Sequence, residues 1–128
     1  MKFLLDTHAL LWWLFDDPAL SATARTAISD RANTVYVSSA SAWEIATKWR
    51  LGRLSEAENV VEQLPELLVA AGFESLPISI SHAIAAGALN AEHRDPFDRM
   101  LIAQAASEGM KLVSKDSMIS ALFSDVLW

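Results

Sequence analysis

Short, continuous apolar runs alternate along the chain with longer amphipathic stretches. Such runs are typical of strands buried on both faces, and they cover residues 2–5, 34–37 and 111–113. A weaker run covers residues 73–80, where Pro77 favours an edge strand, and residues 126–128 are a candidate fifth strand. Strands that alternate with helices predict a mainly parallel sheet covered on both faces. We therefore expect an α/β fold, a three-layer α/β/α sandwich.

Capping signals place the helices between these strands. Ser21 is a candidate N-cap for a helix that runs to about residue 32. Ser41 and Glu44 have the spacing of a capping box, and a second such pair begins a helix at Ser55. Ser81 is expected to begin a further helix. Gly72 and Gly109 are the expected stops of two helices.

Composition makes this one globular domain over residues 1–128. Hydrophobic residues make up 52% of the chain and charged residues 20%, which excludes a disordered polypeptide. The longest apolar run covers residues 9–15, too short for a membrane span, so we expect no membrane partner. Cysteine is absent, which rules out disulfides and thiolate metal sites and fits a cytoplasmic location.

The formal net charge of −6 weighs against nucleic-acid binding, because domains of that kind usually carry a basic patch or stripe. Clustered acidic residues would account for part of the negative total. A divalent cation bound by such a cluster would offset two of these charges.

The most apolar helix of the chain carries an acid on its apolar side. Asp95 is a natural N-cap and Pro96 suits the first helical position, so a helix should begin there and end near residue 108. At 100° per residue, Asp98 lies on the same side as Leu101 and Ile102. A buried, unpaired carboxylate is costly. Something must compensate the charge of Asp98, and a bound cation would do so.

Three further acids lie just past predicted strands. Asp6 and Asp116 each follow a strand, and Glu44 lies one helical turn beyond another. Functional residues of parallel sheets gather beyond the carboxyl ends of the strands, so these acids and Asp98 are expected to converge. Carboxylates without histidine or cysteine favour hard ions such as Mg²⁺, Mn²⁺ or Ca²⁺. Phosphodiester hydrolysis is the natural use of such a site.

Four segments in this order resemble the PIN domain, and more narrowly the VapC-type toxins of bacterial toxin–antitoxin pairs. They are Leu4-Leu5-Asp6-Thr7, Ser41-Ala42-Trp43-Glu44-Ile45, the segment 95–105 with the sequence DPFDRMLIAQA, and Leu112-Val113-Ser114-Lys115-Asp116. Each segment alone is a weak signal. The ordered set spans nearly the whole chain and is fairly specific.

The resemblance implies an endoribonuclease that depends on Mg²⁺ or Mn²⁺ and cleaves RNA. The four acids of the family fall on Asp6, Glu44, Asp98 and Asp116, with Asp6 and Asp98 as direct metal ligands. The fourth position, which falls on Asp116, varies between Asp and Asn in the family. The resemblance also implies a small VapB-like antitoxin and, commonly, a homodimer.

Alternative roles stay open for several of these residues. Glu44 is equally explained as half of a capping box, and Asp95 is an alternative third acid that is better explained as a cap. Thr7 either helps to orient water at a metal or caps a helix. Three basic residues are candidate phosphate contacts, although the first also has the spacing to pair with Glu44: Lys48, Arg99 and Lys115.

Other classes of protein also gather acids at strand ends. A phosphoacceptor receiver domain of two-component signalling should have its acceptor Asp after a mid-chain strand, but the strand here ends in Val37-Ser38. Haloacid-dehalogenase-type phosphatases need Asp-x-Asp after the first strand, and here it reads Asp6-Thr7-His8. A catalytically inactive PIN fold that serves only for binding is the remaining alternative.

Overall fold

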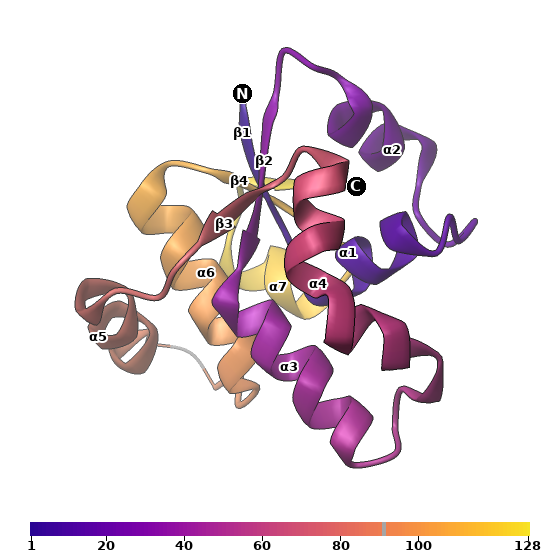
Figure 1. Cartoon of the computed structure of the whole chain (residues 1–128). Coiled ribbons are helices and arrows are strands. Elements are labelled where there is room, and N and C mark those ends of the chain that lie inside the picture. The colour runs from indigo at the N-terminus through magenta and orange to yellow at the C-terminus, as the bar shows by residue number, and fades with distance from the viewer. Residues whose placement is uncertain (91) are drawn as a thin grey trace.

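A computed structural model describes residues 1–90 and 92–128 of the chain. In this part of the chain five strands form a single sheet with the order β3-β2-β1-β4-β5 (Figure 1). Every neighbouring pair is parallel. The strands are β1 (Lys2–Leu5), β2 (Thr34–Ser38), β3 (Glu74–Leu76), β4 (Lys111–Val113) and β5 (Val126–Leu127).

Helices pack on both faces of this sheet. They are α1 (Thr7–Leu14), α2 (Ala22–Ser29), α3 (Ser39–Arg50), α4 (Glu58–Ala71) with a preceding 3-10 turn η1 (Ser55–Ala57), α5 (Ile80–Ala88), α6 (Pro96–Glu108) and α7 (Ser117–Leu122). Phe3 and Leu5 of β1 join a core with α1, α2 and α4, whereas Leu4 joins the core formed with α6 and α7. Successive side chains of a strand point to opposite faces, so β1 contributes to both cores. The predicted three-layer α/β/α sandwich is confirmed.

The sequence predicted that no segment of the chain is long and apolar enough to span a membrane. Within residues 1–90 and 92–128, no helix is both long enough and apolar enough to cross a lipid bilayer.

Three predicted helix starts were wrong. Helix α3 is capped by Ser38, whose hydroxyl accepts the amide of Ala40, and Ser41 lies buried inside the helix. Helix α5 is capped by Ser79 instead of Ser81, in a capping box completed by His82. The capping box predicted for Ser55 and Glu58 does not form: Ser55 begins the 3-10 turn, Glu58 is the first residue of α4, and neither element has a side-chain cap. Serine is abundant near these starts, so spacing alone did not single out the capping residue.

Other predicted boundaries were closer. Helix α2 ends at Ser29, three residues before the expected end. Strand β3 is shorter than the predicted run 73–80 but lies at the sheet edge, as Pro77 indicated. Gly72 and Gly109 end α4 and α6 in the left-handed conformation. Helix α4 is continuous and has Pro65 in its interior.

The strand order reverses between β1 and β4, since the chain runs outward from β1 to β2 and β3 and then returns to β4 on the other side. Ligands of open parallel sheets bind in the crevice beyond the carboxyl ends of strands at such a switch point. Asp6 directly follows β1, and Asp116 lies three residues past β4. Receiver domains have the order 2-1-3-4-5. The observed topology therefore excludes the receiver alternative.

A buried polar link joins the two helices that carry Glu44 and Asp98. Gln104 of α6 is fully buried, and its Oε1 accepts a hydrogen bond of 2.5 Å from the hydroxyl of Ser38 at the start of α3. Its Nε2 donates to the carbonyl of Pro77 over 3.3 Å. This amide fixes α6 against the ends of β2 and β3, and with them the relative position of the two acids.

Replacing Gln104 with leucine is expected to destabilise the protein by about 1–3 kcal/mol, because a buried hydroxyl and a carbonyl each lose a partner. Urea unfolding followed by circular dichroism measures this change. Gln63→Leu, at an exposed position of α4, is the matched control and should lie within about 0.5 kcal/mol of wild type. Equal stability of the two variants would contradict the role of Gln104.

Candidate active site

Asp6 lies at the junction of β1 and α1, where it is both a cap and a buried acid. Its Oδ1 accepts the amide of Ala9 over 2.7 Å, which caps α1, and only 5% of the residue is exposed. Burial raises the pKa of this carboxyl, and the nearby charge of Glu44 raises it further, whereas hydrogen bonds from Ser114 and Ala9 oppose the rise. Asp6 is therefore a carboxylate whose negative charge is poorly compensated.

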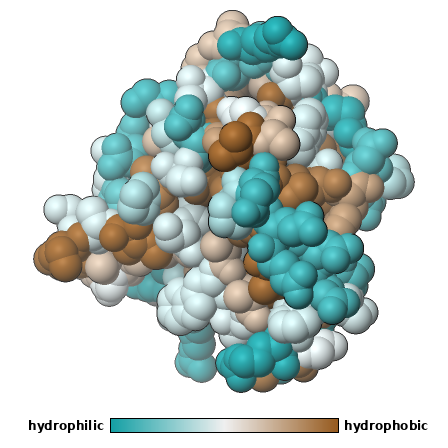
Figure 2. Space-filling view, viewed as in Figure 1, coloured by the Kyte–Doolittle hydropathy of each residue, from teal (hydrophilic) through white to brown (hydrophobic). Residues whose placement is uncertain are grey.

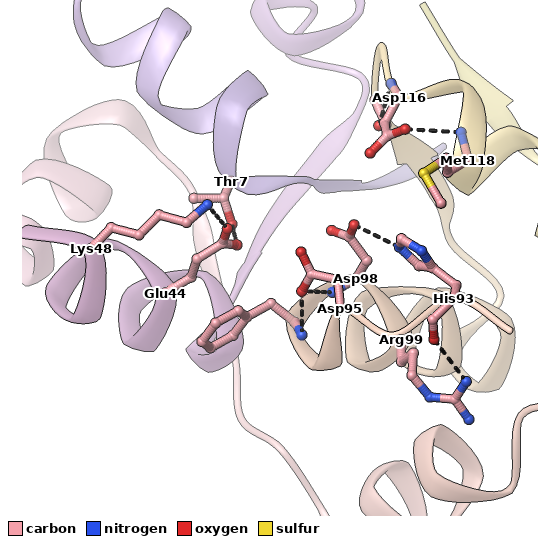
Figure 3. Close-up of polar contacts among 11 residues, drawn as sticks. Thr7, Glu44, Lys48, His93, Asp95, Asp98, Arg99, Asp116 and Met118 are labelled. Atoms are coloured by element: carbon pink, nitrogen blue, oxygen red, sulfur yellow. Dashed lines mark hydrogen bonds and ion pairs between the residues drawn. The ribbon is translucent and has the colours of Figure 1, made fainter. Parts of the chain in front are cut away.

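Glu44 is held between a hydroxyl of α1 and an ammonium group of its own helix. Thr7 Oγ1 donates to Glu44 Oε1 over 2.6 Å and lies 3.1 Å from Ser41 Oγ. The Nζ of Lys48, four residues on, donates to Oε2, which confirms the predicted i, i+4 pair (Figure 3). Glu44 is buried and makes no capping box. Each oxygen of Glu44 thus accepts a hydrogen bond, and together the two bonds hold its carboxylate beside the first residue of α1.

The structure gives Asp95 and Asp98 different roles. Asp95 caps α6, its Oδ1 accepting the amides of Phe97 and Asp98 over 2.9 and 3.3 Å, as predicted. The Asp98 side chain is 16% exposed, and its Oδ2 lies 2.8 Å from His93 Nε2. Burial raises the pKa of Asp98 to about 6, and repulsion from Asp95 and Glu44 adds to this rise against the opposing hydrogen bond of His93.

Asp116 is more exposed than the other acids. Its carboxylate caps α7 by accepting the amide of Met118 over 2.8 Å. Its own amide donates to the buried hydroxyl of Ser114, which also hydrogen-bonds to Asp6. Ser114 therefore connects the first and fourth acids through the end of β4. In Figure 3, Asp116 lies on the other side of Asp98 from Glu44.

The three predicted phosphate contacts differ in their surroundings. Lys48 is partly buried against Glu44, and Lys115 is exposed beside Asp116. Arg99 instead donates to main-chain carbonyls around the end of α5, among them that of Leu89 over 2.7 Å. Of the three, Lys115 is the one exposed to an approaching substrate.

The donor set suits a hard divalent cation, because it consists of carboxylate oxygens. Asp6, Glu44 and Asp98 lie close enough that the charge of Glu44 raises the pKa of the other two. Among the described residues, however, no three acidic or histidine side chains are grouped closely enough to hold a metal ion as they stand. Lys48 and His93 occupy carboxylate oxygens at this site. The donor set fits a cation by its chemistry, and the raised pKa values of Asp6 and Asp98 indicate that the negative charges of these two carboxylates are not fully compensated.

Two residues of this site, His93 and Ser114, had no assigned role in the sequence-based prediction, and Ser41 was assigned only as a helix cap. The serines were hidden because a serine after a strand carries little information by itself. His93 showed no metal-ligand spacing with the other histidines, and its contact with Asp98 depends on the path of the chain between α5 and α6. Its position five residues before Asp98 was the only signal in the sequence.

Comparison of the sequence with known proteins identifies one family over most of the chain. The family model described as PIN domain matches residues 3–122. Ribonuclease VapC22 of Mycobacterium tuberculosis is 34% identical over 114 residues, which span 88% of this chain and 85% of that protein. The predicted resemblance to VapC proteins is thus confirmed.

Solved structures show the same fold. VapBC2 from Rickettsia felis, bound to a DNA fragment from its promoter, matches 100% of this chain and 98% of that chain with a TM-score of 0.71 and 17% identity. A toxin–antitoxin complex from Klebsiella pneumoniae matches 98% and 95% with a TM-score of 0.65 and 20% identity. At these identities the likeness concerns the fold alone. Together with the sequence matches, the strand order and the placement of the acids, it shows that the chain belongs to the PIN-domain family.

Proposed function

We propose that this PIN domain is a divalent-metal-dependent endoribonuclease that acts as the toxin of a toxin–antitoxin pair. The observation that carries the proposal is the gathering of Asp6, Glu44 and Asp98 at the switch point of the sheet, where two of them have raised pKa values. The ribonuclease name of a relative that is 34% identical over 114 residues supports RNA as the substrate.

Asp6 and Asp98 would hold Mg²⁺ or Mn²⁺ directly, and Glu44 and Asp116 would complete the site. When bound, such an ion supplies charge stabilisation for a phosphodiester under attack by water. Thr7 contributes by holding the Glu44 carboxylate. Asp95 contributes by capping α6, the helix on which Asp98 is presented.

Substrate approach has to overcome the net charge of −6. We assign phosphate contact to Lys115, which is exposed next to Asp116, and to Lys48, which is partly exposed where it pairs with Glu44. Arg99 was also predicted to contact phosphate, but its guanidinium is engaged with main-chain carbonyls. The positive charge of a bound cation would add to the local attraction for RNA.

The partner we propose is a small VapB-like antitoxin. The support comes from the structural neighbours, which include a VapBC2 assembly and a toxin–antitoxin complex. Such a partner would have to block or reshape the acidic site. Purified partner added to the cleavage assay described below should therefore stop cleavage.

We further propose that the chain forms a homodimer. Ile80 and Ile84 of α5 are 80% and 66% exposed, and Figure 2 shows hydrophobic residues projecting where α5 lies. Exposed apolar patches commonly mark interfaces. Ile84→Glu is expected to shift the protein from dimer to monomer in sedimentation velocity, with Ser81→Glu on the same helix as the control. A wild-type chain that sediments as a monomer would refute the dimer.

The test of the proposed function is cleavage of a mixed RNA pool by the purified chain. We expect cleavage with Mg²⁺ or Mn²⁺, no cleavage with a chelator, and no cleavage by Asp98→Asn under either condition. Cleavage that survives both the chelator and the substitution would refute the assignment. A chain that binds Mn²⁺ but cleaves no RNA in the pool would favour the alternative, a PIN fold that serves only for binding.

A further inference from the structure

Arg99 of α6 donates hydrogen bonds to main-chain carbonyls of α5 and of residues 89 and 93 beyond it. Arg99 donates through Nε to the carbonyl of Ala86 over 3.1 Å and through Nη2 to that of Leu89 over 2.7 Å. Through Nη1 it donates to the carbonyl of His93 over 3.1 Å. One planar guanidinium thus joins the end of α5 to the main chain at residue 93.

The side chain of His93 turns from this anchored main chain onto Asp98. Its Nε2 lies 2.8 Å from Asp98 Oδ2, and the imidazole is only 8% exposed (Figure 3). An ionised carboxylate can only accept, so Nε2 is the donor when Asp98 is charged. Arg99 therefore fixes the main chain of His93, and the side chain of His93 in turn contacts the Asp98 carboxylate. The hydrogen bonds of Arg99 given above are to main-chain carbonyls.

We propose that His93 and Arg99 are positioning residues that fix the orientation of the Asp98 carboxylate for cation binding. His93 does so by direct contact, and Arg99 acts through the main chain of His93. This inference rests on the proposed function, in which Asp98 is a cation ligand.

The physical reason is the freedom of an aspartate side chain in the first turn of a helix. Without a partner the carboxylate rotates, and ordering it on cation binding costs conformational entropy. Hydrogen bonds to ligating groups remove this freedom in advance, and their loss typically costs 10–100-fold in metal affinity. His93 supplies such a bond from a side chain that is itself almost fully buried.

The choice of arginine at position 99 follows from the geometry of its contacts. Five N–H groups in a rigid plane can reach several carbonyls at once, which a lysine ammonium cannot reproduce. A residue that only contacted RNA phosphates, as predicted for Arg99, would tolerate lysine far better. Arg99→Lys therefore distinguishes a positioning role from a purely electrostatic one, because it keeps the positive charge and loses the planar set of N–H donors.

The experiment measures Mn²⁺ affinity of the full-length chain by isothermal titration calorimetry, a readout independent of RNA cleavage. His93→Phe, which keeps a ring but lacks the donor, is expected to weaken Mn²⁺ binding about tenfold or more. His93→Gln, which keeps an N–H donor of similar reach, should recover most of this loss. Arg99→Lys should weaken binding to a similar extent, and Arg25→Lys on α2 is the matched control that should not.

The double variant decides whether Arg99 acts through His93. If it does, His93→Phe combined with Arg99→Lys binds Mn²⁺ no more weakly than His93→Phe alone, because coupled residues do not give additive losses. Additive losses, or wild-type affinity in His93→Phe, would overturn the proposal. Circular dichroism of each variant confirms that the comparison is made between folded proteins.

The same titration separates this proposal from the proposed function. Loss of Mn²⁺ binding in Asp98→Asn with full binding in His93→Phe refutes the positioning role and leaves the metal site in place. A wild-type chain that binds no Mn²⁺ refutes the metal site, and the positioning role with it.

Discussion

Asp98→Asn is expected to abolish metal-dependent RNA cleavage and, at the same time, to stabilise the metal-free protein. Cleavage should fall at least about a hundredfold, the scale on which single groups that stabilise transition-state charge contribute. Stability should rise because asparagine keeps the size of the side chain and removes a carboxylate that burial and neighbouring acids disfavour. Opposite effects of one substitution on activity and stability are the signature of a charged site.

The raised pKa of Asp98 also predicts the direction in which its contribution to stability changes with pH. The pKa of Asp98 is about 6 in the folded chain and near 3.8 when unperturbed. Between these values the folded protein binds the proton of Asp98 more tightly than the unfolded chain, so the contribution of Asp98 to wild-type stability falls as pH rises from about 4 to 6. The decrease from Asp98 is on the order of 1–3 kcal/mol, with solvent screening favouring the lower end. Asp98→Asn should lack this component of the decrease.

Urea unfolding at several pH values with chelator present, beside the cleavage assay, measures both effects. Asp95→Asn is the matched control, because it makes the same chemical change three residues earlier. Asparagine caps helices as well as aspartate does, so this control should keep both the fold and cleavage. Loss of cleavage in Asp95→Asn with retention in Asp98→Asn would show that the third acid had been assigned to the wrong residue.

The sheet was predictable because its strands carry their own signal. Residues 2–5, 34–37 and 111–113 are apolar and mostly buried after the first residue of each run, and all three strands were located to within one residue. The start of α6 was equally clear, since an Asp-Pro pair combines a cap with the first helical position. The starts of α3 and α5 were not, because their caps compete with nearby serines and one capping box uses His82 in place of an acid.

The acidic residues of the site could be predicted from the sequence, but only some of the side chains that contact them could be. Asp6, Glu44 and Asp98 could be found because each follows a strand or faces an apolar helix surface. The pair of Lys48 with Glu44 was also visible, since i, i+4 contacts are local. Neither the contact of His93 with Asp98 nor the carbonyl contacts of Arg99 has a regular spacing. These depend on the tertiary path between α5 and α6, which no periodicity encodes.

The second large effect is expected at Asp6, where charge and capping can be separated. Asp6→Asn removes the buried charge but can still accept the amide of Ala9, whereas Asp6→Ala loses both functions. Both variants should lose cleavage at least about a hundredfold. Without metal, Asp6→Asn should be more stable than wild type, because burial and the charge of Glu44 raise the pKa of this carboxyl and so disfavour its ionised form at neutral pH.

Asp6→Ala should be less stable than Asp6→Asn by about 1 kcal/mol, the usual contribution of an N-cap. Thermal and urea unfolding with chelator give this order, and Asp30→Asn serves as control because Asp30 also accepts a main-chain amide but is exposed. That control should change neither cleavage nor stability by a measurable amount. If Asp6→Asn proved less stable than wild type at neutral pH, the Asp6 carboxylate would be stabilised by its surroundings, and no cation would be needed to compensate it.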